Sequence, residues 1–207
     1  MGTILILGCR VDAVGREAAV DRIVALADAG GAALVVTLGV EMVMAAQRDE
    51  RFRDAINAAE LVTCDTIGLL LVSRLRGGPL RERVTGVDLL GALAARSAAG
   101  ADLRLYLLGG AGDTAQRAAE ALRRAAPGAA IVGARDGYFS EAESPAVAAA
   151  VRASGANVLL AGLGSPKQEL WLRRHLAASG CGVGIGIGGS LDVYAGNVVR
   201  APRLVQR

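Results

Sequence analysis

The sequence is poor in aromatic residues and in net charge, and both shortages exclude functions. Aromatic residues make up only 3% of the 207 residues, too few for a protein that binds single-stranded nucleic acid by stacking its bases. The formal net charge is +3, and without a basic cluster this charge does not favour binding to a duplex. We therefore expect no nucleic-acid partner.

Cysteine and histidine are too few and too scattered to form a zinc site. The cysteines Cys9, Cys64 and Cys181 form no C-x-x-C pair, and His175 is the only histidine. Structural zinc sites need four such ligands, usually in close pairs. We therefore expect buried thiols in a reducing compartment and no catalytic role for His175.

The chain also lacks the signals that carry a protein into or across a membrane. Met1 leads directly into the apolar segment 3–7, without the basic stretch and cleavage site of a signal peptide. The longest uncharged stretch, 175–191, contains six glycines, whereas a membrane span needs about 20 predominantly apolar residues. We expect a cytoplasmic protein.

What the chain does contain is an alternation of short apolar runs and longer amphipathic segments. Apolar residues make up 53% of the sequence, enough for a substantial core. Strands are predicted at 3–7, 33–37, 61–64, 103–108, 130–132, 158–161 and 183–187. Helices are predicted at 16–27, 66–76, 113–126, 144–153 and 166–178. Because the strands are almost wholly apolar, they predict an α/β fold, Rossmann-like, with a mostly parallel sheet covered by helices on both faces. We expect a single domain over residues 1–207.

Glycine-rich turns follow several of these strands, where ligands of such sheets bind. The turns lie at 37–39, 65–66, 109–112, 162–169 and 188–190. Several of them lead into predicted helix N-termini, whose free N–H groups and dipole favour a phosphate. Together they indicate a phosphorylated ligand.

Absent motifs narrow the choice of that ligand. The P-loop pattern is missing, and the segment Gly8–Asp12, expected as the first strand-to-helix turn, lacks G-x-G-x-x-G, which disfavours a dehydrogenase. No D-x-D pair is present to hold a metal ion on a sugar nucleotide. A nucleotide diphosphate would therefore be neutralised by cationic side chains and backbone amides.

The strongest local signal is the segment 162–171. Ser165 as N-cap, Pro166 at the first helical position and Gln168 in a capping box predict a well-capped helix start. Lys167 does not fit this purely structural interpretation, because a cation at a helix N-terminus is unfavourable unless an anion binds there.

These motifs resemble the WecG/TagA/CpsF family of bacterial glycosyltransferases. The resemblance rests on the segment 162–171, on 188–192, 195–196 and 200–202, and on upstream pieces from Thr37 to 136–139. It implies a metal-independent, cofactor-free, inverting transfer of an N-acetylmannosamine-type sugar or related hexose or uronic acid. The donor would be a UDP-sugar, the acceptor a polyprenyl-diphosphate-linked sugar, and the pathway cell-surface polysaccharide synthesis such as teichoic acid or exopolysaccharide.

The resemblance also suggests roles for single residues, each with a structural alternative. Asp65 matches the family's proposed base but also suits an N-cap. Thr37 matches a sugar-pocket threonine but also suits a strand end. Arg83 would bind phosphate oxygens with its forked guanidinium or be a solvated charge. Tyr138 would cover uracil and Asp192 would contact the nucleoside, or both serve local packing. The predicted binding set is completed by Gly109, Gly110, Gly162, Gly164, Lys167, Gln168 and Glu169.

Three departures from the family pattern qualify these expectations. Gly39 stands where the family commonly has Asn, and Thr66 follows Asp65 where the family usually has Gly. The chain also ends five residues after Pro202, without the basic and aromatic tail that most members use at the membrane. Arg200, Arg203 and Arg207 would give only weak attachment to the inner face of the cytoplasmic membrane, at about 1 kcal/mol per basic residue, or form a solvated end.

Two other functions stay open from the sequence alone. A non-catalytic UDP-sugar-binding or assembly subunit would bind UDP without transferring sugar. A nicotinamide-dependent dehydrogenase is the weaker alternative. The family resemblance also implies a homo-oligomer.

Overall fold

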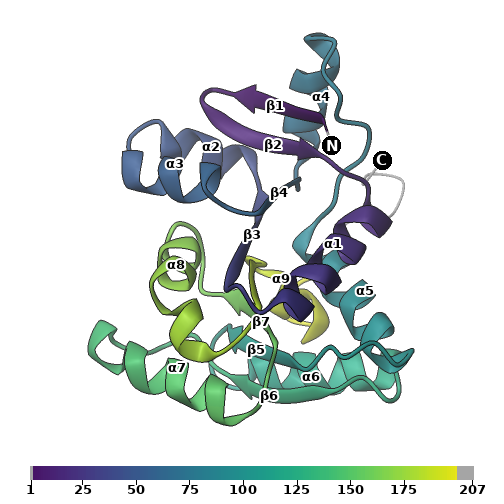
Figure 1. Cartoon of the computed structure of the whole chain (residues 1–207), viewed down its shortest axis with the longest axis vertical. Coiled ribbons are helices and arrows are strands. Elements are labelled where there is room, and N and C mark those ends of the chain that lie inside the picture. Colours follow the sequence, from purple (N-terminus) through teal and green to yellow (C-terminus); the bar gives the residue numbers. More distant parts are fainter. Residues whose placement is uncertain (1, 200–207) are drawn as a thin grey trace.

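The centre of the protein is a parallel sheet, shown in Figure 1 with the helices that cover it. The computed structural model describes residues 2–199, and within them the sheet has six strands in the order β4-β3-β8-β7-β5-β6. The strands are β3 (Ala33–Leu38), β4 (Leu61–Cys64), β5 (Leu105–Gly109), β6 (Ile131–Arg135), β7 (Val158–Gly162) and β8 (Val183–Gly186). All neighbouring pairs run parallel, so their carboxyl ends share one edge. The predicted Rossmann-like fold class is confirmed.

Helices cover both faces of this sheet and enclose two separate cores. One face carries α2 (Val40–Ala46), α3 (Glu50–Asn57), α7 (Ser144–Ala153) and α8 (Lys167–Ser179), with the short 3-10 turn η1 (Glu141–Glu143) leading into α7. The other carries α1 (Arg16–Ala29), α5 (Gly86–Ala98), α6 (Thr114–Ala125) and α9 (Ser190–Tyr194). The remaining helix, α4 (Ile67–Leu75), lies beside β1 (Gly2–Ile6). Within residues 2–199, no helix is both long and apolar enough to cross a bilayer.

Glycines in β8 let α8 pack unusually close to the sheet. Side chains on a strand alternate between faces, and on the α8 side of β8 the alternate positions are Gly184 and Gly186. A Cβ on Gly184 would lie 2.8 Å from Leu172 Cδ2, and one on Gly186 would lie 2.7 Å from Glu169 Oε1. The absence of these two side chains therefore brings the first turn of α8 against the carboxyl end of β8.

The expected first strand does not join the parallel sheet. β1 pairs antiparallel with β2 (Cys9–Ala13), which was not predicted, so Gly8–Asp12 is a hairpin turn and second strand. The expectation of a strand-to-helix turn there is wrong. Leu7 and Gly8 have φ values of +48° and +78°, and two central residues with positive φ form the tight turn that suits hairpins. The hairpin covers the outer edge of β4, where Val62 N donates to Asp12 Oδ2 at 2.8 Å.

Candidate functional site

A cleft of about 480 Å³ lies at the carboxyl ends of the central strands. Its walls are the turns that follow β5, β6, β7 and β8. Six of the predicted binding residues line it: Gly110, Tyr138, Gly162, Gly164, Lys167 and Asp192. Because these residues come from four separate turns, the fold gathers segments that are far apart in the sequence.

The floor of the cleft requires glycine. A Cβ on Gly109, whose φ is +148°, would collide with the carbonyl of Gly162, and a Cβ on Gly162 would lie 2.7 Å from Gly188 O. Gly109 therefore lies beneath the cleft rather than on its surface. The turns after β5, β7 and β8 approach each other so closely at these glycines that there is no room for side chains between them. The space above these turns is therefore open to a ligand.

The turn between β5 and α6 carries a signal that sequence reasoning missed. Residues Gly110–Ala115 read G-x-G-x-x-A, directly after a strand and leading into a helix, which is the variant dinucleotide-binding pattern. Gly112 has a φ of +56° and open space where a side chain would lie. The hairpin turn at Gly8 lacks this pattern, whereas the strand-to-helix turn after β5 contains it. Such a turn suits the approach of a diphosphate to backbone amides and to the N-terminus of α6.

Lys167 is the first residue of α8 and stands at the edge of the cleft. Its Nζ lies 3.4 Å from the carbonyl oxygen of Gly137 and 5.0 Å from the ring centroid of Phe139. A cation at this end of a helix opposes the helix dipole. An anion in the cleft would reverse that unfavourable interaction.

The expected capping box at the start of α8 is wrong. The helix begins at Lys167 with Pro166 as N-cap and no side-chain cap, because Gln168 turns inward instead of back towards Ser165. Gln168 is only 2% exposed. Its Nε2 donates to Glu169 Oε1 at 2.7 Å, and its Oε1 accepts from Gly188 N at 3.2 Å. Gln168 thus supports the turn that forms one wall of the cleft.

Glu169 is the most buried charged group beneath the cleft. Burial raises its pKa above the ordinary value of 4.5, while hydrogen bonds from Gln168 and Ser165 act in the opposite direction. A raised pKa in the folded state means that the protonated acid is favoured there. Its stabilising contribution is complete below pH 4.5 and is lost as the pH rises through the raised value.

Asp65, Arg83 and Thr37 form a second group, on the β4 side of the same sheet edge. Asp65 N donates to Leu38 O at 2.9 Å, which ties the end of β4 to that of β3. Thr37 is buried, and its hydroxyl donates to Gly186 O at 2.8 Å. Asp65 is half-buried, and α4 begins at Ile67 with Thr66, not Asp65, as its N-cap residue.

Arg83 is held next to Asp65 by backbone pairing. Val84 N donates to Cys64 O at 2.7 Å, and the hydroxyl of Thr63 donates to Val84 O at 2.8 Å. Burial raises the pKa of Cys64 to about 11, with the Asp65 carboxylate adding to the rise and the Arg83 guanidinium opposing it. Both charges therefore lie near the same thiol. Thr63, which fixes the Arg83 segment, was not identified from the sequence.

The glycine cleft and the Asp65 group lie on the same edge of the sheet, but they do not line one common cavity. Asp65 does not line the glycine cleft; β4 is separated from β8, the nearest strand of the cleft, by β3. Adjacent strands lie about 4.8 Å apart, so the gap is on the order of 10 Å. A ligand that carries a diphosphate and a hexose spans a gap of this order.

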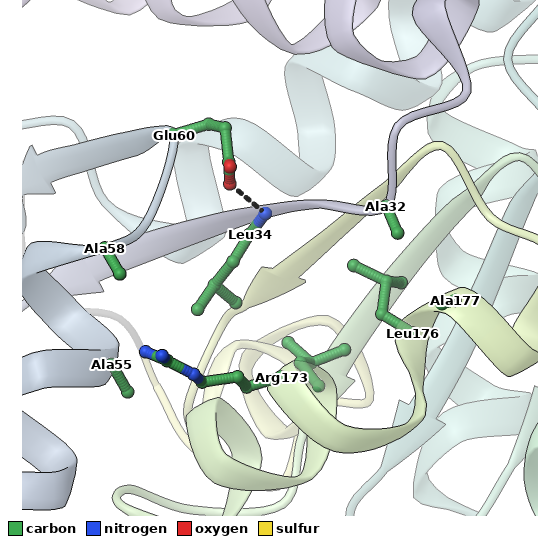
Figure 2. Close-up of a pocket in the computed structure, with 9 residues that line it drawn as sticks. Ala32, Leu34, Ala55, Ala58, Glu60, Arg173, Leu176 and Ala177 are labelled. Atoms are coloured by element: carbon green, nitrogen blue, oxygen red, sulfur yellow. Dashed lines mark hydrogen bonds between the residues drawn. The ribbon is translucent and has the colours of Figure 1, made fainter.

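A second, smaller cavity of about 230 Å³ lies at the opposite end of the sheet (Figure 2). It is formed by α3, α8 and the start of β3, and its lining is largely alanine and leucine. The Glu60 carboxylate does not point into it as a free group, because Leu34 N donates to Glu60 Oε2 at 2.7 Å. Arg173 also lines this cavity and donates to Asp54 O at 3.2 Å, so both charged residues of the lining are engaged by backbone groups.

A family model and a curated relative both match most of the chain. The model of the glycosyl transferase WecG/TagA/CpsF family matches residues 4–207. The N-acetylglucosaminyldiphosphoundecaprenol N-acetyl-beta-D-mannosaminyltransferase of Bacillus spizizenii is 33% identical over 175 residues, which cover 84% of this chain and 67% of that relative. Both matches extend over most of the chain, and the family model includes the segments that form the cleft and the Asp65 group. The chain belongs to the WecG/TagA/CpsF family and is a glycosyltransferase.

Proposed function

We propose that the enzyme transfers an N-acetylmannosamine-type sugar from UDP to a sugar linked to a polyprenyl diphosphate, in cell-surface polysaccharide synthesis. The observation that carries this proposal is the glycine-lined cleft with Lys167 at its edge, on the same sheet edge as Asp65. The printed name of the relative supports the sugar and the lipid-linked acceptor.

In this proposal, the cleft holds the UDP part of the donor. The turn Gly110–Ala115 offers backbone amides and the α6 N-terminus to the diphosphate, and Lys167 offers a positive charge. The exposed Tyr138 ring would cover the uracil, and Asp192 would contact the nucleoside. These groups would balance the diphosphate charge without a metal ion.

The sugar then extends from the cleft towards Asp65, where transfer takes place. The acceptor hydroxyl attacks the anomeric carbon, the bond from that carbon to the diphosphate oxygen breaks, and UDP departs with the bonding electrons. Asp65 accepts the hydroxyl proton as general base. A single displacement of this kind inverts the anomeric centre. Arg83 would bind a phosphate of the acceptor and Thr37 would line the sugar pocket, while Gln168 and Glu169 would support the cleft wall from which the sugar extends.

A non-catalytic UDP-sugar-binding subunit is the second candidate, and the surroundings of Gly39 favour it. The carboxylate of Glu41 folds over Gly39 so closely that a Cβ there would collide with it. An acidic group thus takes the space in which the family commonly has an Asn side chain. This candidate predicts UDP binding with no transfer, even with an acceptor supplied. Contact with the inner membrane face and a homo-oligomer stay predictions, and Arg200, Arg203 and Arg207 lie outside the described residues.

Thermal unfolding with a panel of nucleotide-sugars tests the proposed donor. A ligand at 100 times its Kd stabilises the folded state by about 2.7 kcal/mol, and 1 kcal/mol raises the Tm of a chain of this size by about 2–4 °C. We therefore expect UDP-N-acetylmannosamine to raise the Tm by about 5–10 °C. GDP- and ADP-sugars are the controls and should have little effect. Stabilisation by none of the UDP-sugars would contradict the proposal.

A further inference from the structure

The outward face of α4 is apolar where a water-facing helix is normally charged. Ile67, Leu71 and Leu75 recur at the four-residue spacing that aligns side chains on one face. Leu71 and Leu75 are 49% and 87% exposed, and Val72 beside them is also exposed. Nothing within the described residues covers this stripe, although the helix is well packed on its other side.

The inner face of α4 explains why the stripe points outward. Leu69, Leu70 and Ser73 are buried, and the first two belong to the core on that side of the sheet. At about 100° per residue, these three positions lie opposite Leu71 and Leu75. The helix therefore has two apolar sides, one facing the core and one facing outward.

Arginines border the exposed stripe. Arg74 and Arg76 are exposed; helical spacing places Arg74 on one flank of Leu71 and Leu75, and Arg76 follows Leu75 as the C-cap residue of α4. No acidic residue occurs from Ile67 to Arg81. Asp65 and Glu82 flank this segment, and the Glu82 carboxylate is engaged, because it accepts from Arg16 N. An apolar centre with a basic border is the pattern of a helix that lies in a lipid–water interface, where long arginine side chains reach the headgroups.

The hairpin lies beside this helix, because β1 packs against α4. Figure 1 shows α4 and the hairpin together at the end of the molecule opposite α6 and α7. We call the side chains of Ile67, Leu71, Val72 and Leu75 the α4 surface.

We propose that the α4 surface docks the enzyme on an anionic lipid membrane, with its apolar side chains at the acyl boundary and Arg74 and Arg76 on lipid phosphates. This rests on the proposed function, in which the acceptor is linked to a lipid diphosphate. Ile67, at the start of the surface, is two residues after Asp65. Docking therefore brings the proposed base to the level of the headgroups, where the acceptor diphosphate lies.

A second copy of the chain fits the same surface less well. In a two-fold contact the same patch meets itself. The basic borders of two copies would then approach each other with no acidic partner between them, which is electrostatically unfavourable. An anionic lipid surface instead pairs with every arginine of the border.

Co-sedimentation of the full chain with phosphatidylglycerol/phosphatidylcholine vesicles tests the proposal. We expect Leu71→Glu/Leu75→Glu to lower the bound-to-free ratio at least about tenfold, because two leucine side chains no longer enter the interface. Arg74→Gln/Arg76→Gln should lower it several-fold, and pure phosphatidylcholine should bind less wild type. Val132→Glu is the matched control: Val132 is 37% exposed, in β6 at the far edge of the sheet, and its replacement should leave vesicle binding unchanged.

Three results would contradict docking through the α4 surface. Wild type that ignores anionic vesicles, or a Leu71→Glu/Leu75→Glu variant that binds them as wild type does, would overturn the proposal. So would sedimentation velocity in which this variant only dissociates an oligomer while vesicle binding persists. With a short-chain, water-soluble acceptor the same variant should transfer sugar at the wild-type rate. If wild type transfers none, the proposed function fails, and the vesicle result still decides the docking.

Discussion

Asp65→Asn is expected to lower sugar transfer about 10²–10⁴-fold while leaving UDP affinity nearly unchanged. General base catalysis contributes about 10²–10⁴ in rate, and an amide cannot accept the acceptor proton at neutral pH. Because Asp65 does not line the glycine cleft, its loss should not disturb the diphosphate site. Transfer is measured with UDP-N-acetylmannosamine and a short-chain lipid-linked acceptor, and UDP binding by calorimetry.

Asp21→Asn supplies the matched control for this prediction. Asp21 is an exposed aspartate whose partner is Arg96, on α1 away from the cleft, so the same chemical change there should leave transfer intact. A turnover of Asp65→Asn within a few-fold of wild type would show that another group takes the proton. An equal loss of UDP affinity would instead place Asp65 in the donor site.

Lys167→Ala should weaken UDP binding about tenfold or more. A hydrogen bond to a charged group contributes about 1.5–3 kcal/mol, and each 1.4 kcal/mol is tenfold in affinity. Lys167→Arg keeps the charge and should retain most of the affinity. Arg174→Ala is the control on the same helix, because Arg174 is exposed and engaged by Glu141. Calorimetry with UDP that shows equal affinity for Lys167→Ala and wild type would remove this residue from the site.

A labelling experiment can reach the same residue without a mutation. Lys167 is the only lysine in the chain, so reductive methylation with ¹³C marks it together with the N-terminal amine alone. UDP should shift the NMR signal of the Lys167 methyl groups. A signal that does not shift at saturating UDP would contradict the assignment of Lys167 to the UDP site, as an unchanged affinity in calorimetry would.

The parallel sheet could be predicted from the sequence, whereas the hairpin could not. Strands buried on both faces are nearly all apolar, and that pattern is read directly. The strand β2 could not be predicted from the hydrophobic pattern, because it carries Arg10 and Asp12 and charged residues are usually exposed to solvent. In the structure Asp12 is buried, where it accepts from Val62 N and pairs with Arg10 at 3.3 Å. A buried ion pair that caps a sheet edge leaves no trace in a hydrophobicity pattern.

The helix α5 was missed for a related reason. Its glycines, Gly86 and Gly91, lower the helix propensity of the segment. Both have a packing cause: a Cβ on Gly86 would lie 2.9 Å from Ile187 O, and Gly91 leaves room for the Tyr194 hydroxyl. Contacts with residues about 100 positions away in the sequence require glycine at these two positions, so local helix propensity could not predict α5.

The cleft itself could be anticipated, but the direction of its side chains could not. Glycine turns after parallel strands locate the ligand edge, and Lys167 lies there as expected. Gln168, the next residue, turns into the core to hold Gly188 N, because the glycines of β8 open space for it. The gap between Asp65 and the cleft follows from the strand order, which places β3 between β4 and β8 and which the sequence does not encode locally.

The central claim is that backbone amides and Lys167, rather than a chelated cation, balance the diphosphate while Asp65 takes the proton. Transfer by the purified chain, measured with UDP-N-acetylmannosamine and a lipid-linked N-acetylglucosamine acceptor in excess EDTA, tests it most directly. We predict a product of inverted anomeric configuration at the same rate with and without the chelator. No product despite UDP binding, or transfer that EDTA abolishes and a divalent cation restores, would contradict it.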